Sequence, residues 1–94
     1  MINKKDIDKL LTLTRKWHNE SDPEKAAVFC DQAKALSEKI AEGTPFQRND
    51  PVAGNVFFSS AWYVAEKRWT NRQMYILLDR NGVNNAGEWI GDSL

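Results

Sequence analysis

Apolar residues recur at three- and four-residue intervals over residues 3–19, with polar residues at the other positions. The apolar members of this stripe are Ile7, Leu10, Leu11 and Trp17. This spacing predicts an amphipathic helix. Asn3, with an acidic Asp6 three residues later, is typical of the start of such a helix. Asp8 and Arg15 fall on the polar side of the pattern, so we expect them to face solvent.

A second helix is predicted over residues 22–42. Asp22 can cap it, Pro23 suits the first helical position, and Gly43 can take the left-handed conformation that ends a helix. Its apolar stripe consists of Phe29, Ala33, Leu36 and Ile40. Because the connection to the first helix is short, the two are expected to form an antiparallel hairpin.

Residues 44–55 contain two prolines and a glycine and are predicted to be a loop. A third helix is then expected over residues 56–69. Its apolar residues cover a wide arc that comprises Phe57, Phe58, Ala61, Trp62, Val64, Ala65 and Trp69. Such an arc indicates a central helix with neighbours on more than one side, with Trp62 and Trp69 in the core.

Thr70 and Gln73 have the spacing of a capping box, so a fourth helix is predicted over residues 70–81. The alternative is a hairpin around residues 73–83, because Asn81-Gly82 also fits a tight turn and short apolar runs suit either state. A short C-terminal turn is expected within residues 84–90. The chain, residues 1–94, is therefore expected to be one all-α domain, a small bundle of about four helices, with an α+β fold as the alternative.

Composition excludes several classes of function. The 13 basic and 13 acidic residues give a formal net charge of zero, whereas a nucleic-acid-binding protein usually shows a basic excess. No apolar run approaches the roughly 18 residues that a membrane span needs. The N-terminus lacks an apolar signal core and there is a single cysteine, so the expected location is cytoplasmic, with no membrane association.

The residues that usually carry catalysis or bind metals are scarce. His18 is the only histidine and Cys30 the only cysteine, so a four-ligand zinc site cannot form. His18 falls at the end of a predicted helix, and Cys30 lies among alanines and Phe29, which is typical of a buried, unreactive thiol. The expectation is a protein that is not an enzyme and that needs no cofactor or metal.

Aromatic and basic residues gather at the end of the third predicted helix. Tyr63, Lys67, Arg68 and Arg72 combine the residue types that dominate protein-binding hot spots. The 44–55 loop adds two further candidates, Phe46 and Arg48. These six residues are the predicted partner-binding set.

The first hypothesis for the function is a non-enzymatic accessory protein that acts through a protein partner, as adaptors and inhibitors do. Phages and mobile elements encode many small chains of this class. The second is a nucleic-acid accessory factor that uses the local aromatic and basic residues. A homodimer is a further expectation, because a chain with a shallow core often relies on self-association.

Overall fold

The computed structural model describes residues 2–50 and 53–83, and four helices lie in these ranges. They are α1 (Lys4–Asn19), α2 (Pro23–Ala41), α3 (Val56–Lys67) and α4 (Asn71–Arg80). The predicted all-α bundle is confirmed, and α4 covers the segment for which a hairpin was the alternative. The predicted turn within residues 84–90 lies outside the described residues.

Side-chain caps set the start of the first three helices. The Asn3 Oδ1 accepts the amide N–H of Asp6 at 2.9 Å, as the sequence predicts for α1. The Asp22 carboxylate caps α2, because it accepts the N–H of Glu24, the second residue of that helix, at 3.1 Å. Asn55 caps α3, and its Oδ1 accepts the N–H of Phe58 at 3.0 Å. Each cap satisfies an amide that the helix itself leaves unpaired.

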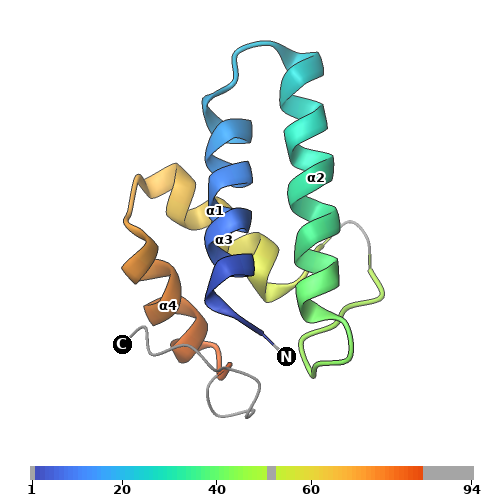
Figure 1. The fold of residues 1–94 in the computed structure, drawn as a ribbon, viewed down its shortest axis with the longest axis vertical. Helices are drawn as coiled ribbons and strands as arrows, with labels where there is room; N and C mark the ends of the chain where they lie inside the picture. The colour runs from blue at the N-terminus through green and yellow to red at the C-terminus, as the bar shows by residue number, and fades with distance from the viewer. Residues whose placement is uncertain (1, 51–52, 84–94) are drawn as a thin grey trace.

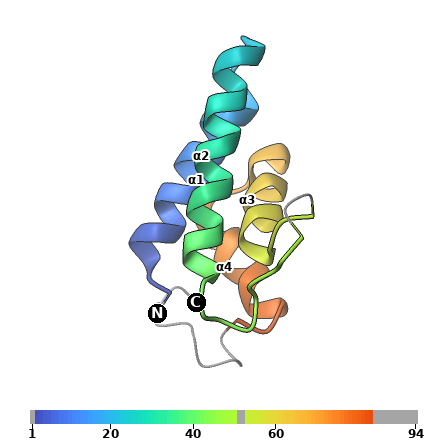
Figure 2. The same ribbon diagram turned by 90° about the vertical axis from the view of Figure 1, so that its right-hand side faces the viewer.

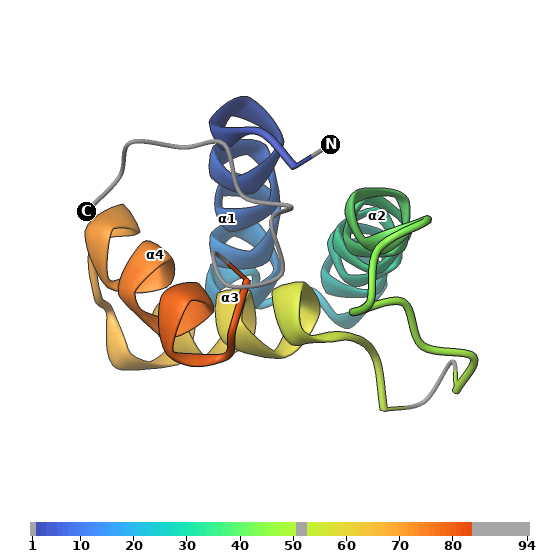
Figure 3. The same cartoon turned by 90° about the horizontal axis from the view of Figure 1, so that it is seen from below.

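The four helices form two layers. α1 and α2 make the predicted antiparallel hairpin, which is one layer (Figure 1). α3 and α4 form the second layer, which lies against one face of the hairpin (Figure 2). Seen from below, α3 lies next to α1 and extends toward α2, and it contacts both, while α4 lies on the side of α1 away from α2 (Figure 3). The opposite face of the hairpin has none of the described helices over it.

The core lies between the two layers, and α3 supplies its centre. Phe57, Ala61 and Val64 are fully buried, as expected of a central helix. The other helices contribute mainly Ile7, Leu10, Leu11, Ala33, Ile40, Met74 and Leu78. Trp62 is half-buried at the edge of this core, where its ring packs on Trp17 with 4.3 Å between the centroids.

The two halves of α2 differ in burial. None of residues 23–32 is buried, whereas Ala33, Ser37, Ile40 and Ala41 in the second half are. The first half projects with the end of α1 beyond α3 and α4 (Figure 1). Val28 on this half is 53% exposed.

A polar network joins α1 to α4 and was not predicted from the sequence. Asp8 Oδ1 accepts hydrogen bonds from the Asn71 side-chain amide, at 2.9 Å, and from the Tyr75 hydroxyl. Arg15 donates to Asn71 Oδ1 at 2.7 Å. The expectation that Asp8 and Arg15 simply face solvent is therefore wrong: both are half-buried at this junction. Burial and the bond from Tyr75 to Asp8 raise the pKa of the Tyr75 hydroxyl above its ordinary value, so it stays a donor.

Candidate functional site

The end of α3 is unusual because a left-handed residue other than glycine stops the helix. Arg68 has a φ of 57° and a ψ of 35°. Its N–H donates to the Ala65 carbonyl at 3.2 Å, and the next N–H, of Trp69, donates to the Val64 carbonyl at 3.0 Å. These are the two bonds of a Schellman motif, in which the left-handed position is usually a glycine.

This turn moves Trp69 off the apolar stripe of α3. The residue was expected in the core as the last turn of a helix over 56–69, but the helix ends at Lys67 and Trp69 is 36% exposed. Its ring meets that of Tyr63, itself 43% exposed, edge to face at 5.3 Å. The Lys67 ammonium lies 5.5 Å from the centre of the Tyr63 ring. We call Tyr63, Lys67, Arg68 and Trp69 the aromatic corner.

α1 holds the aromatic corner in place. Arg15 donates one hydrogen bond to the Trp69 carbonyl at 3.0 Å and another to the side chain of Asn71, one residue past the cap of α4. On the other side of the corner, the Thr70 N–H donates to Gln73 Oε1 at 2.8 Å, and the Thr70 hydroxyl donates to the same oxygen. The predicted pairing of these two residues at the start of α4 is thus present, and the backbone between the helices is fixed on both sides.

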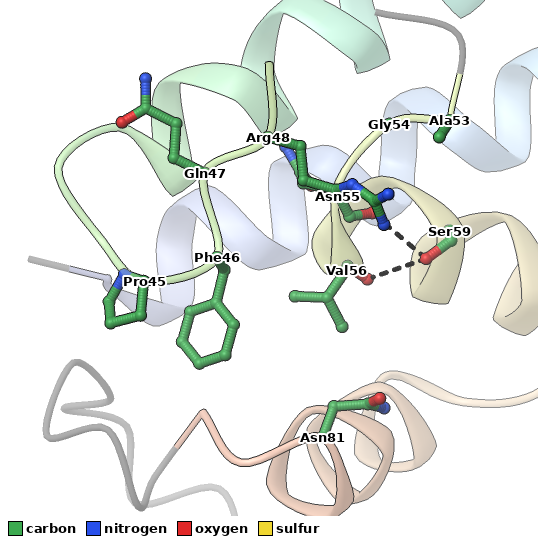
Figure 4. A pocket seen from close by; sticks show the side chains of 10 residues that line it. All are labelled: Pro45, Phe46, Gln47, Arg48, Ala53, Gly54, Asn55, Val56, Ser59 and Asn81. Carbon is green, nitrogen blue, oxygen red and sulfur yellow. Dashed lines mark hydrogen bonds between the residues drawn. The ribbon is translucent and has the colours of Figure 1, made fainter. Parts of the chain in front are cut away.

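A second feature, the α3–α4 groove, leads away from Tyr63. It consists of two adjoining hollows of about 380 and 440 Å³ that share Val56, Ser59 and Asn81. The first hollow also includes Ser60, Tyr63 and Leu77, and the second includes Phe46 and Arg48 from the loop. Phe46 and Val56 both line the second hollow, and Asn81, the residue just past α4, lies across it (Figure 4).

The structure brings together most of the predicted partner-binding set. Tyr63, Lys67 and Arg68 share the aromatic corner, and the groove connects Tyr63 to Phe46 and Arg48 at the other end of α3. Phe46 is half-buried, with its ring 5.9 Å from that of Phe57 in the core.

Arg72 is the member of the set that stands apart. It is exposed on α4, five residues from Leu77 and hence about 140° around the helix from the groove. The sequence did not reveal Trp69 as a surface residue, because its apolar character and spacing are those of a core position.

His18 and Cys30 have ordinary surroundings. The His18 ring meets the Trp62 ring at 5.2 Å, and its Nδ1 is 3.3 Å from Asn19 Oδ1. Burial, and after it the Asp31 carboxylate, raise the pKa of the half-buried Cys30 thiol. A raised pKa disfavours the reactive thiolate. Among the described residues, no group of three His, Cys, Asp or Glu is arranged to hold a metal ion.

The chain matches no protein-family model, no curated protein and no solved structure. Within residues 2–50 and 53–83, none of the helices combines the length and apolar character needed to cross a membrane.

Proposed function

We propose that this protein is a non-enzymatic binding protein of the adaptor or inhibitor type, and that it contacts a protein partner through the aromatic corner. The observation that carries the proposal is the conformation of Arg68 beside the exposed Tyr63–Trp69 pair. The proposal includes the cytoplasmic location expected from the sequence.

Arg68 is the one non-glycine residue with a positive φ in the described ranges. The other left-handed positions there are held by Gly43, Gly54 and Gly82. A side chain costs roughly 1–2 kcal/mol in this conformation, whereas glycine avoids that cost. Backbone strain that persists next to exposed residues is a feature of functional sites. A role for the Arg68 side chain in binding accounts for an arginine at this position.

The composition of the corner suits a protein partner. Tryptophan, tyrosine and arginine are the residues most enriched at binding hot spots. Because Arg15 and the Thr70–Gln73 pair already hold the backbone, little conformational entropy is lost when a partner binds.

Nucleic-acid binding is the second candidate function, supported by Lys67, whose ammonium lies near the Tyr63 ring, and by the exposed Arg68 and Arg72 that follow it in the sequence. Two observations favour a protein partner over it. Bases stack on open aromatic faces, but the Lys67 ammonium lies over the Tyr63 ring and Trp69 packs against that ring. In addition, the net charge of zero provides none of the long-range attraction that phosphate backbones give to basic proteins.

The surroundings of the two most reactive side chains support the non-enzymatic part of the proposal. The Cys30 thiol is half-buried with a raised pKa, which disfavours the nucleophilic thiolate. His18 packs on Trp62 and is 3.3 Å from Asn19. Neither residue therefore has the surroundings of an activated nucleophile or a general base.

The test is a quantitative pull-down from native extract of the source cells. The baits are the wild-type protein, the double variant Tyr63→Ala/Trp69→Ala, and the control Val28→Ala, which removes another exposed apolar side chain, on α2. We expect a protein captured by the wild type and the control to be lost from the double variant. Circular dichroism establishes that all three baits are folded.

Capture that is equal for all three baits would remove the aromatic corner as the binding surface. A parallel titration with DNA and RNA oligonucleotides across a salt series tests the second candidate. Affinity that falls steeply with salt and depends on Lys67, Arg68 and Arg72 would favour nucleic acid over a protein partner.

A further inference from the structure

The α3–α4 groove has an apolar floor. The half-buried side chains of Phe46, Val56 and Leu77 line it, and each also packs against the core. Their positions are therefore fixed by the fold, and their outer surfaces are available to an incoming apolar side chain. Burial of such surface is the main source of binding free energy at protein interfaces.

Two polar side chains of the groove, those of Ser59 and Asn81, are already hydrogen-bonded to backbone carbonyls one turn earlier in the chain. The Ser59 hydroxyl lies 3.1 Å from the Asn55 carbonyl and donates to it, and the Asn81 amide donates to the Leu77 carbonyl at 2.7 Å. Backbone groups of α3 and α4 are likewise paired along the helices. An extended peptide would leave its own N–H and C=O groups without partners against these walls, whereas a helix satisfies its backbone internally.

The charged side chains at the groove are basic, within the part of the chain that the structure describes. Arg48 lines the second hollow, and none of the described lining residues is acidic. At the opposite end the Lys67 ammonium lies over the Tyr63 ring. Neither Lys67 nor Glu66, the acidic residue of α3, lines a hollow, but the contact with Tyr63 places the Lys67 ammonium beside the first hollow. A partner that complements this surface carries negative charge near both ends.

We propose that the α3–α4 groove receives an acidic amphipathic helix of the partner protein. The groove follows α3 from Val56 to Tyr63, a span of about 12 Å, and continues to Arg48 in the loop, so the bound helix has at least about two turns. Apolar residues at i, i+4 and i+7 contact Phe46, Val56 and Leu77, and carboxylates near the two ends face Arg48 and Lys67. This inference rests on the proposed function and names the chemistry of the partner.

A phage-displayed library of 14-residue helical peptides tests the inference. The wild-type protein is immobilised, and soluble Ser59→Glu protein is present in excess to remove peptides that bind elsewhere. Ser59 is exposed in the middle of the groove, so a glutamate there adds bulk and a repelling charge without disturbing the core. We expect enriched sequences with apolar residues at helical spacing and Asp or Glu near the ends.

A synthetic copy of the most enriched peptide then gives affinities by fluorescence anisotropy. We expect at least about tenfold weaker binding to Ser59→Glu and about three- to tenfold weaker binding to Arg48→Glu. The matched control for Ser59→Glu is Gln32→Glu, which also adds one negative charge, at an exposed position of α2. This variant should bind the peptide as the wild type does.

The proposal fails if no peptide is enriched, if the enriched peptides are basic or lack helical spacing, or if Ser59→Glu binds them like the wild type. Displacement of the peptide by a DNA oligonucleotide would instead indicate nucleic acid as the occupant. Ser59→Glu also serves as a bait in the pull-down. A partner that is lost from the Tyr63/Trp69 double variant and retained by Ser59→Glu would support the proposed function while contradicting the helix in the groove.

Discussion

Arg68 illustrates how a single backbone conformation shapes the surface. Its left-handed φ ends α3 at Lys67 and turns the chain, so the Trp69 ring packs against Tyr63 at the surface instead of continuing the apolar stripe. The side chain of Arg68 itself is exposed. The geometry of the corner therefore depends on the conformation of this residue, which glycine would adopt at lower cost.

We expect Arg68→Gly to stabilise the fold while it weakens capture of the partner. Relief of the left-handed strain should raise the free energy of unfolding by about 1 kcal/mol, which corresponds to roughly 4–8 °C in Tm for a chain of this size. Thermal unfolding followed by circular dichroism measures the change.

The neighbouring variant Lys67→Gly is the control, because the same substitution in a helical conformation should lower stability by roughly 0.5–1 kcal/mol. A lower Tm for Arg68→Gly would contradict the assignment of strain to this residue.

The burial and the hydrogen-bond partners of single residues were the hardest features to predict from the sequence. The apolar spacing of α3 continues to Trp69, but a periodic pattern holds only as far as the helix does, and no glycine at position 68 indicated the stop. Asp8 and Arg15 looked like solvent-facing residues because their partner, Asn71, comes 63 and 56 positions later in the chain. A spacing rule that covers one helix cannot detect a hydrogen bond at that separation.

Individual helices were predictable because their ends have local causes. Asn3, Asp22 and Thr70 lie at the starts that their types and spacing predict, and Gly43 takes a positive φ just past α2. Helix caps of this kind depend only on residues within four positions of each other, so the local sequence is enough to predict them. The groove is different, since it forms only where two helices and a loop meet.

α2 combines a buried half with an exposed half in one continuous helix. Its second half packs in the core through residues such as Ala33 and Ile40, whereas residues 23–32 include no fully buried side chain. Helical stability in proteins comes mostly from tertiary packing, so the two halves should differ in local stability.

We expect the backbone amides of residues 27–32 to exchange with solvent at least about tenfold faster than those of residues 37–41. Both segments lie inside α2 and have intrahelical hydrogen bonds, so a difference would report packing and not helix ends. Native-state hydrogen exchange followed by NMR or mass spectrometry gives the rates. Equal protection along the helix would mean that another contact stabilises the projecting half.

At the scale of the whole molecule, the polar network ties the first helix to the last described one. Asn71 is its centre, because it donates to Asp8 and accepts from Arg15. All three residues are half-buried, and loss of one partner there leaves a charged group incompletely satisfied. The network therefore contributes to stability and also fixes the position of α4 relative to α1.

We expect Asn71→Ala to lower the free energy of unfolding by about 1–3 kcal/mol. Its neighbour Arg72 is exposed on the same helix, so Arg72→Ala should change stability by no more than about 0.5 kcal/mol. Chemical denaturation of the two variants measures both values. Similar stabilities for the two would show that the network adds nothing to the fold.

The hydrogen bond from Arg15 to the Trp69 carbonyl has a consequence for the order of events during synthesis. The two residues are 54 positions apart, so the α1–α2 hairpin leaves the ribosome well before the chain that completes the corner. The aromatic corner is therefore held in its final geometry only once α4, the last described helix, has begun to form. A peptide that copies residues 56–83 would carry most of the contact side chains but lack the arginine that holds them, and it should compete poorly for the partner.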